Sequence, residues 1–247
     1  MKYSILLFLF TLSIPLSAAE NTQSSIIKLI NDMEEIYRGG SSSAELTMTV
    51  ASPYFERSMK MASDNLGKDF AFIRILSPKK DKGISTLKRH KEMWNYFPKI
   101  NKKIKVPPSM MMGSWMGSDF TNDDLVKQTT LTEEYDLALV EDDLSYNITL
   151  IPKEQTITVW GKIEYVVNKE YRVPQAQNFY DDNFELIRSL EFKKIKDFGG
   201  RMLPSELIMT PHTKKGHKTT IVYDKLIFNS PTVNEDTFSL RNLMSRR

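Results

Sequence analysis

Apolar and polar residues alternate along most of the chain, which is the pattern of half-buried β-strands. The alternation is clearest over 44–50, where Ala, Leu, Met and Val side chains alternate with Glu and Thr. Short runs rich in β-branched and aromatic residues, separated by turns with Asp, Asn or Gly, predict further strands. These strands are expected at 69–76, 93–97, 134–140, 145–151, 156–160, 163–168, 171–180, 185–196, 201–210 and 218–228. About ten strands at short spacing predict a mainly β fold, an antiparallel sheet or barrel.

One stretch near the N-terminus follows a helical period instead. Its apolar residues recur at intervals of three or four positions. They are Ile26, Ile27, Ile30, Met33, Ile36 and Tyr37. Gly39 and Gly40 follow, and glycine is common where a helix ends. Because one face of this helix is apolar, we expect the helix to cover part of the sheet.

The first nineteen residues have the features of a secretory signal peptide. Lys2 gives a positive start, the run 5–14 is almost wholly apolar, and SAA at 17–19 offers a cleavage site of small residues. The apolar run is shorter than the ~20 residues that a membrane-spanning helix needs. The sequence therefore predicts a signal peptide at 1–19. The mature chain, 20–247, is expected to be one soluble domain in the periplasm of a Gram-negative-type envelope.

Composition narrows the choice of function. The 247 residues include no Cys, which excludes a disulfide scaffold, a Cys-ligated metal site, a thiol nucleophile and a lipid-modified N-terminal cysteine. Lys and Arg total 34 against 31 Asp and Glu, so the charge balance gives no support for nucleic-acid binding. This near-neutral total conceals two charged stretches. The stretch 79–105 holds ten Lys or Arg and two acids, whereas 119–143 holds nine acids and one Lys.

The basic stretch has two interpretations. Lysines on outward-facing strand positions discourage edge-to-edge aggregation, and this alone explains many of them. The alternative is a docking surface for an anionic membrane or an acidic partner, since clustered charge steers such partners at long range. Under this second interpretation the docking residues are Lys99, Lys102, Lys103 and Lys105.

Between the two charged stretches lies a segment rich in Met and Trp, 107–118, which is bounded by prolines and glycines. Methionines usually fill cores, but their flexible thioethers also suit a surface that must fit apolar ligands of varied shape. We expect this segment and the N-terminal helix to close the concave side of a curved sheet, leaving a cavity for acyl chains. The candidate cavity and lid residues are Trp94, Tyr96, Phe97, Met110, Met111, Met112, Trp115, Met116 and Phe120.

Catalytic chemistry finds little support. The sequence lacks a Gly-x-Ser-x-Gly elbow, a phosphate-binding glycine-rich loop and a His-Glu-x-x-His motif. His212 and His217 flank a lysine-rich turn, where exposed turn residues are a simpler interpretation than a metal site. Asp119, Asp123 and Asp124 suit the start of a helix better than a cation site or the active site of an exported hydrolase. We therefore predict a protein that is not an enzyme and that uses no cofactor or metal.

Several strings of residues are similar to those of a known family. The most specific is MGSDFTNDDL at 116–125; the others are TLKR at 86–89, MWNYFP at 93–98, RMLP at 201–204 and DTFSL at 236–240. With them the chain resembles the periplasmic outer-membrane lipoprotein-sorting proteins, a LolA-like family. The resemblance implies a half-open antiparallel β-barrel, in which an N-terminal helix and a short helical, Met-rich lid cover an apolar cavity. No position of this sequence is assigned to the lid-locking arginine of that family.

Two functions follow for the mature chain. The resemblance implies a monomeric periplasmic carrier that binds lipid or lipoprotein acyl chains and moves them between membranes. Its implied partners are a membrane surface, contacted transiently, and an inner-membrane transporter of the resistance–nodulation–division type. The alternative is a periplasmic adaptor or sensor that docks on a membrane protein and transfers no cargo.

Overall fold

The described part of the chain, residues 16–127 and 131–245 of a computed structural model, is built around one antiparallel sheet of 13 strands. The strands are β1 (Ser41–Ala51), β2 (Glu56–Leu66), β3 (Phe70–Ser77), β4 (Ser85–Arg89), β5 (Glu92–Phe97), β6 (Lys102–Lys105), β7 (Tyr135–Glu141), β8 (Ser145–Pro152), β9 (Lys162–Asn168), β10 (Pro174–Tyr180), β11 (Leu186–Asp197), β12 (Met202–Pro211) and β13 (Lys218–Phe228). The prediction of a mainly β fold is confirmed. The predicted signal peptide falls mainly on residues 1–15, which lie outside the described residues.

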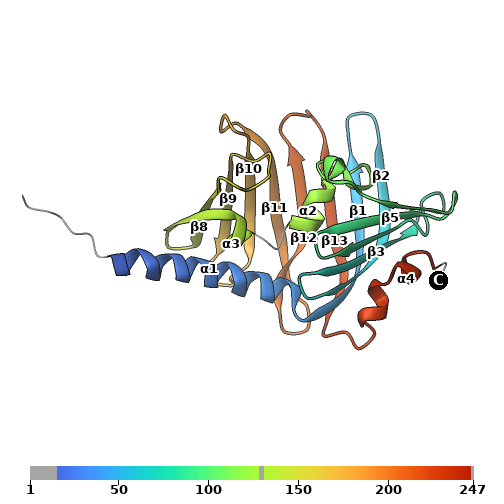
Figure 1. Cartoon of the computed structure of the whole chain (residues 1–247), viewed down its shortest axis with the longest axis horizontal. Helices are drawn as coiled ribbons and strands as arrows, with labels where there is room; N and C mark the ends of the chain where they lie inside the picture. Colours follow the sequence, from blue (N-terminus) through green and yellow to red (C-terminus); the bar gives the residue numbers. More distant parts are fainter. Residues whose placement is uncertain (1–15, 128–130, 246–247) are drawn as a thin grey trace, which may run out of the picture.

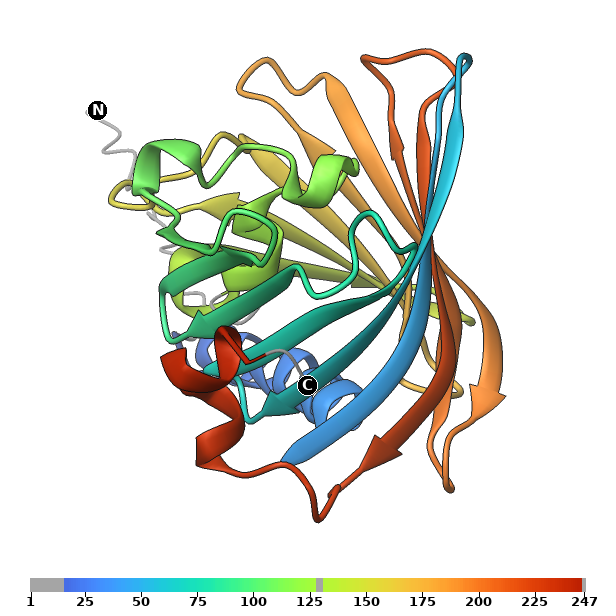
Figure 2. The ribbon, with the colours of Figure 1, turned by 90° about the vertical axis from the view of Figure 1, so that its right-hand side faces the viewer.

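Consecutive strands lie side by side, with a single jump. From one edge the order is β6-β5-β4-β3-β2-β1-β13-β12-β11-β10-β9-β8-β7. Strand β1 pairs with β2 on one side and with β13 on the other, so the first and last strands meet in the middle of the sheet. Strands β6 and β7 are the two edges and are not neighbours, which leaves the curved sheet open between them (Figure 2). The predicted half-open barrel is confirmed.

Residues 106–134 connect the edge strand β6 to the other edge strand, β7. The described residues of this connection, 106–127 and 131–134, carry four short helices: η1 (Pro108–Met110), η2 (Trp115–Gly117), α2 (Asn122–Lys127) and α3 (Leu131–Glu134). We call residues 106–127 the lid. The green lid and the blue helix α1 (Leu16–Arg38) both lie on the concave side of the sheet (Figures 1 and 2). Among residues 16–127 and 131–245, no helix is both long and apolar enough to cross a bilayer.

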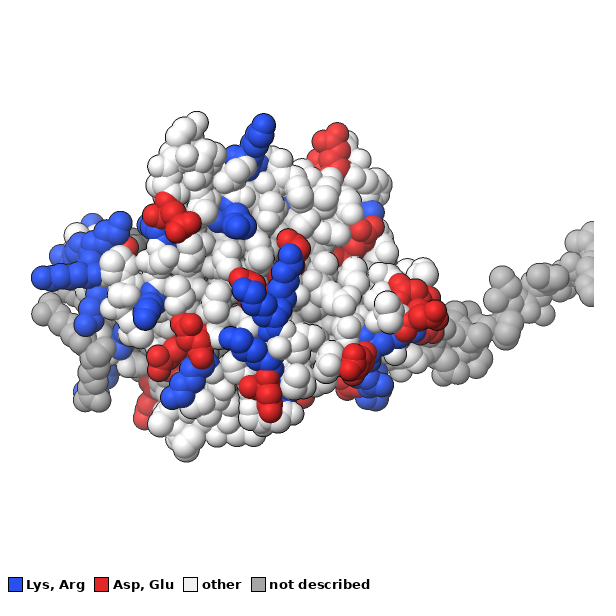
Figure 3. Space-filling model, turned by 180° about the vertical axis from the view of Figure 1, so that it is seen from behind, with Lys and Arg blue, Asp and Glu red and all other residues white. Residues whose placement is uncertain are grey.

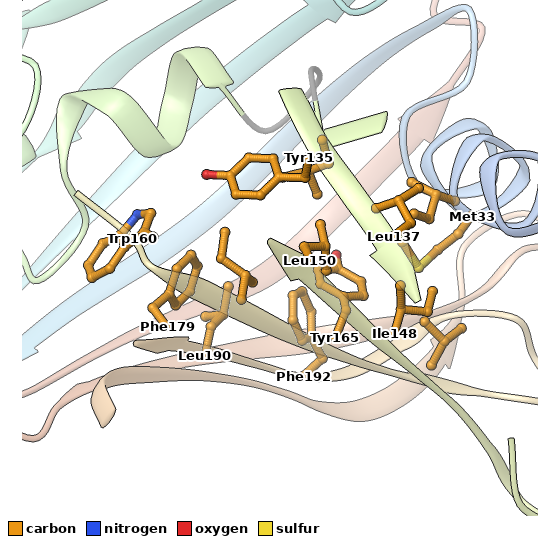
Figure 4. Close-up of a cluster of buried hydrophobic side chains, with 14 of the residues drawn as sticks. Met33, Tyr135, Leu137, Ile148, Leu150, Trp160, Tyr165, Phe179, Leu190 and Phe192 are labelled. Carbon is orange, nitrogen blue, oxygen red and sulfur yellow. The ribbon is translucent and has the colours of Figure 1, made fainter. Parts of the chain in front are cut away.

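Two clusters of buried side chains fill the concave side. The first, which we call the aromatic cluster, joins Ile26, Ile30 and Met33 of α1 to the inward faces of β7–β12. Several of its aromatic side chains come from neighbouring strands and point toward one another (Figure 4). They include Tyr135, Tyr165, Phe179 and Phe192, together with Trp160 from the loop before β9. The apolar helix period predicted from the sequence is therefore what holds α1 against the sheet.

The second interior cluster, which we call the methionine cluster, lies under the lid. Met48, Met59, Met61 and Met93 from β1, β2 and β5 meet Trp115 of the lid there. A third cluster lies on the other face of β3–β5, where η3 (Glu235–Phe238) and α4 (Leu240–Leu243) pack. The C-terminal segment thus covers an outward face of the sheet that would otherwise meet water.

The strand predictions are wrong in two respects. Residues 156–160 form no strand and belong to the loop between β8 and β9, whose apolar content reflects the burial of Trp160 in the aromatic cluster. Strands β2, β4 and β6 carried no strand prediction. All four residues of β6 are exposed at the sheet edge, and residues 85–88 (STLK) of β4 are all buried despite being mostly polar. Neither strand shows the alternation that marks a half-buried strand.

Candidate functional site

A cavity lies between the lid, the C-terminal part of α1 and the concave face of the sheet. Its volume is ≈ 240 Å³, far above the ~10–15 Å³ that one water molecule needs. Most of its wall is apolar: Met33, Ala44, Leu46, Met61, Ala71, Ile73, Trp115, Phe120, Leu125, Pro174, Phe192, Leu207, Ile221 and Leu226. The wall therefore combines residues from α1, from both halves of the sheet and from the lid.

Polar groups line a smaller part of the same cavity. Ser42, Ser63 and Asn65 lie together where β1 begins and β2 ends, and Asn65 Nδ2 donates to Ser42 Oγ at 3.3 Å. Tyr165 and Tyr223 contribute phenol rings to the wall. Burial raises the pKa of the Tyr223 hydroxyl, so this group stays protonated and polar at neutral pH. The cavity is thus apolar with a few hydrogen-bonding groups, which is the usual make-up of a small-molecule site.

Trp115 anchors the lid to the floor of the barrel. Its side chain is 4% exposed, and its Nε1 donates to Thr86 Oγ1 at 3.1 Å. Thr86 in turn donates to Asn95 Oδ1 on the next strand at 2.7 Å. This short chain of hydrogen bonds satisfies polar groups that are buried under the lid, and each bond adds about 1 kcal/mol.

The lid is also tied to β2 and β13. A guanidinium nitrogen of Arg57 donates to the backbone carbonyl of Met116, at a turn where Met116 has φ 50° and Gly117 has φ 68°. A Cβ at Gly117 would come within 2.8 Å of the same guanidinium, so glycine is needed for this close approach. On the other side, the backbone N–H of Asp119 donates to Thr219 Oγ1 at 2.9 Å, and Thr219 donates back to Asp119 Oδ2 at 2.7 Å.

A buried ion pair joins helix α2 to β11. Thr121 caps the helix, since the Asp124 N–H donates to Thr121 Oγ1 at 3.2 Å and the Thr121 N–H donates to Asp124 Oδ2 at 2.7 Å. Arg188 donates to both oxygens of the same carboxylate, at 2.8 and 2.5 Å. The Arg188 side chain is 5% exposed, and its guanidinium carbon lies 4.6 Å from the ring centre of Trp160 and 4.2 Å from that of Phe179. Its Nε has no hydrogen-bond partner among the described residues.

A second, smaller cavity lies beside this ion pair. Its volume is ≈ 50 Å³, and it shares Phe120 and Asp124 with the larger cavity. Tyr135, Trp160 and Phe179 of the aromatic cluster form part of its wall. Burial raises the pKa of the Tyr135 hydroxyl, which also donates to Thr158. Helix α2 thus lies between the two cavities, because Asp124 borders both.

The structure separates the predicted lid residues into three groups. Trp115 and Phe120 line the larger cavity. Met111 and Met116 pack partly buried against the methionine cluster. Met110 and Met112 are 60% and 37% exposed on the outer surface of the lid. The Met-rich segment therefore covers the cavity, but only part of it faces inward.

The predicted residues of β5 do not line either cavity. Along this strand Met93 points into the methionine cluster, whereas Trp94 and Tyr96 belong to the cluster under η3 and α4. Phe97 is half-buried at the end of the strand. Strand alternation puts successive residues on opposite faces, and the C-terminal segment covers the outward one. Aromatic content alone could not show which side of β5 faced the cavity.

The predicted docking lysines lie at one edge of the molecule. Lys102, Lys103 and Lys105 are on the edge strand β6, and Lys99 is in the turn before it; all four are exposed. Lys105 pairs with Glu92 and lies 5.5 Å from the ring centre of Trp94. Lysines on an exposed edge strand guard against aggregation, so their position agrees with the simpler interpretation as well as with docking.

Several residues of the site escaped the sequence prediction, above all the cavity-lining residues of β12 and β13, and Arg188, which pairs with the cavity residue Asp124. A signal for Arg188 does exist in the sequence. Leu190 and Phe192 face inward, and Arg188 shares their parity on the same strand. A charged residue at an inward position of a strand requires a buried partner. The sequence does not name that partner, which lies 64 residues away.

The sequence favours no catalytic or metal site at the lid aspartates or at the histidines, and the structure gives the positions of these residues. Asp124 accepts from the Thr121 N–H at the helix start, as expected, whereas Asp119 bonds to Thr219 on β13 and caps no described helix. His212 is exposed, with Nε2 2.9 Å from Ser189 Oγ. Within the described part of the chain, no three His, Asp or Glu side chains group so as to hold a metal ion.

Several solved structures share the fold of this chain. An outer membrane lipoprotein-sorting protein domain from Vibrio parahaemolyticus is 20% identical over 92% of this chain and 100% of its own, with a TM-score of 0.77. A DUF1329 family protein from Desulfovibrio piger is 21% identical over 90% of this chain and 99% of its own, with a TM-score of 0.77. A LolA superfamily protein from Nitrosomonas europaea is 16% identical over 87% and 98% of the two chains, with a TM-score of 0.71. The predicted LolA-like fold is confirmed.

A protein-family model also matches the chain. The matching model carries the description "Uncharacterized protein" and covers residues 67–245. The chain belongs to this family. No curated protein matches the chain.

Proposed function

We propose that the chain is a periplasmic carrier that binds the acyl chains of a lipid or lipoprotein beneath its lid. The observation that carries the proposal is the cavity of ≈ 240 Å³, whose wall is mostly apolar and whose cover is a separate segment of chain. Each CH₂ group buried against such a wall contributes about 0.8 kcal/mol, which favours an acyl chain over a small polar ligand. The names of two structural neighbours, a lipoprotein-sorting protein and a LolA superfamily protein, support the same class of cargo.

The cavity is smaller than the roughly 300–1,000 Å³ typical of ligand sites, so cargo entry requires the lid to shift. The side chains under the lid suit such a movement. Met61 lines the cavity, and Met111 and Met116 pack against the same cluster from the lid side. Methionine has three rotatable side-chain bonds and repacks around ligands of different shape at small cost.

Arg57 contacts the lid from the sheet. It is on β2, and its guanidinium holds the lid backbone at the carbonyl of Met116. The LolA-like resemblance implies one such arginine, and we propose Arg57 for this role. Arg57→Leu removes the hydrogen bond while keeping an apolar stem. We expect faster uptake of an acyl probe by this variant in stopped-flow measurements.

The carrier proposal is tested with a fluorescent fatty acid, dansylaminoundecanoic acid, titrated into the purified mature chain. Leu207→Trp should abolish probe binding, because Leu207 lines the cavity and a larger ring fills it. Ile208→Trp is the matched control, since Ile208 is the next residue of β12 and faces the other side of the sheet. Thermal unfolding checks that both variants fold. No binding by the wild-type chain, together with no lipid extracted from protein purified from its own periplasm, would contradict the proposal.

The second candidate is an adaptor or sensor that docks on a membrane protein. The observation that favours it is the exposure of Lys99, Lys102 and Lys103 at the β6 edge. A transporter of the resistance–nodulation–division type is the partner that the resemblance implies for the carrier as well. Reversing all three lysines to Glu should abolish co-purification with such a partner and leave probe binding intact. Lys225→Glu, on exposed β13 sequence away from this edge, is the control.

A further inference from the structure

Two neighbouring hairpins project from one end of the sheet. Between β2 and β3, the pair Lys60–Ser77 is the one nearest this end of the sheet. Residues 56–59 of β2 extend past that pair toward the β1–β2 turn. The β12–β13 hairpin lies beside the β1–β2 hairpin, because β1 and β13 pair. Their turns are in contact: a Cβ on Gly216 would come within 2.9 Å of the Pro53 ring. We call residues 52–55 and 212–218 the paired tips.

The first tip presents two aromatic side chains to solvent. Tyr54 is 91% exposed and Phe55 is 53% exposed. The turn is held by Ser52, whose N–H donates to the Phe55 carbonyl at 2.9 Å and whose Oγ accepts from the N–H groups of Tyr54 and Phe55 at 3.2 Å each. The two rings therefore project from a structured turn. Exposed aromatic residues side by side mark an interaction site more often than isolated apolar residues do.

The second tip supplies positive charge beside these rings. Lys214, Lys215 and Lys218 are all exposed, and the sequence 212–218 (HTKKGHK) holds no acid. Along the upper edge of Figure 3, the β1–β2 tip is white and the neighbouring β12–β13 tip is blue. The chemistry of the paired tips is therefore aromatic and cationic.

A third tip at the same end provides a natural contrast. The β10–β11 turn also exposes an aromatic ring, with Phe184 59% exposed. Its neighbours are acidic, namely Asp181, Asp182 and Glu185, and this tip is red in Figure 3. At the β10–β11 turn three acids surround the ring and one lysine, Lys162, lies 6.0 Å from its centre, whereas residues 52–55 and 212–218 of the paired tips hold lysines and no acid.

We propose that the paired tips dock the protein on an anionic lipid bilayer, with Tyr54 and Phe55 in the headgroup region and the lysines of 214–218 on lipid phosphates. Aromatic side chains favour the membrane–water interface, and each Lys near an anionic surface contributes about 1 kcal/mol. The inference deepens the proposed carrier function, because it assigns the surface that meets a membrane. Failure of the docking proposal can be distinguished from failure of the carrier proposal, because probe binding in the cavity is measured without vesicles.

Flotation of the mature chain with lipid vesicles tests the proposal. The wild-type chain should float with phosphatidylcholine vesicles that contain phosphatidylglycerol and remain unbound with pure phosphatidylcholine. Lys214→Glu/Lys215→Glu should lower the partition coefficient tenfold or more, given about 1 kcal/mol per lysine. Tyr54→Ser/Phe55→Ser should lower it as well. Phe184→Ser and Lys196→Glu are matched controls that should bind as the wild type does; Lys196 is exposed near the opposite end of β11.

Because the chain contains no Cys, a single label reports on each tip. Tyr54→Cys labelled with the fluorophore NBD should shift to the blue with anionic vesicles, whereas labelled Phe184→Cys should not. Absence of wild-type binding overturns the proposal, and so does an equal loss in the tip variants and their controls. Binding that needs a membrane protein in the vesicles overturns it in favour of a protein partner.

Discussion

The two halves of the sheet are packed in different ways. Strands β7–β12 and α1 enclose a continuous aromatic cluster, in which Leu150 and Val167 are fully buried. Strands β1–β5 carry the methionine cluster, and its cover is the lid. The larger cavity lies where these two halves meet, since its wall takes Leu46 and Met61 from one half and Phe192 and Leu207 from the other.

This difference teaches how a fold can be stable and adjustable at once. A helix with a long apolar face closes one half, and its burial holds the scaffold together. The lid closes the other half, where Trp115 and Val126 are buried in the methionine cluster and polar contacts such as Trp115 to Thr86 hold the lid as well. The halves are joined by strand pairing through β13, and also by a buried ion pair, Arg188 on β11 with Asp124 on the lid. The predictions below test this division.

The largest expected effect comes from breaking the link between the halves. Arg188→Met leaves the Asp124 carboxylate without its buried partner and should lower the free energy of unfolding by about 3–5 kcal/mol. The double variant Arg188→Met/Asp124→Leu should recover part of this loss, because it removes the uncompensated charge. Urea unfolding of both variants and of Asp124→Leu gives the coupling energy. A coupling near zero would show that the pair does not link the halves.

The next prediction compares the two clusters directly. Leu150→Ala in the aromatic cluster should cost about 3 kcal/mol, because the rigid surroundings leave an unfilled cavity. Met61→Ala in the methionine cluster should cost about 2 kcal/mol, since Met61 already borders a cavity and flexible neighbours can fill the space. Chemical denaturation measures both costs. Equal costs would argue that the two halves are equally rigid.

A smaller effect is expected at the lid anchor. Trp115→Phe keeps an aromatic ring but removes the hydrogen bond to Thr86 Oγ1, and it should cost about 1 kcal/mol. Because the lid is then held less firmly, we expect faster exchange of backbone amide hydrogens in the lid than in β8. Hydrogen-exchange mass spectrometry measures the difference. Uniform acceleration across both regions would mean that Trp115 supports the whole fold.

The smallest effect concerns pH and the outward face of the aromatic half. Burial and a 2.5 Å hydrogen bond to Glu164 raise the pKa of Tyr180 from 10.0 to about 12. The folded state therefore keeps this proton at a pH where the unfolded chain loses it. The stabilisation is complete below pH 10 and is lost as the pH rises to about 12. Solvent screening keeps the change below about 1 kcal/mol. Denaturation of the wild-type chain and Tyr180→Phe across this range should differ in slope.

Much of the fold could be predicted from local patterns. The period-two alternation in β1 and the helical period of α1 follow from geometry within one element, and both predictions hold. The start of α2 was also predictable, because Thr121 and Asp124 have the spacing of a reciprocal cap. Strands β4 and β6 were not predictable in this way. One is buried on both faces and the other on neither, so neither alternates.

The candidate site was predictable only in part. The Met- and Trp-rich composition of 107–118 marked the lid, and Trp115 and Phe120 do line the cavity. Trp94, Tyr96 and Phe97 were all predicted to line the cavity, although neighbouring residues of a strand face opposite sides. The sequence could not indicate that the C-terminal segment covers the side of Trp94 and Tyr96. Which face of a strand becomes interior depends on what packs against it from elsewhere in the chain.

The sequence by itself thus determined the elements, their turns and the unusual character of the lid, because these depend on residues close together in the chain. Only the tertiary structure decided which side chains form the cavity, since its wall gathers residues from 33 to 226. It alone paired Arg188 with Asp124 and placed Tyr54 and Phe55 beside the lysines of 214–218. Contacts over such separations are fixed by sheet order, and short-range patterns do not encode that order.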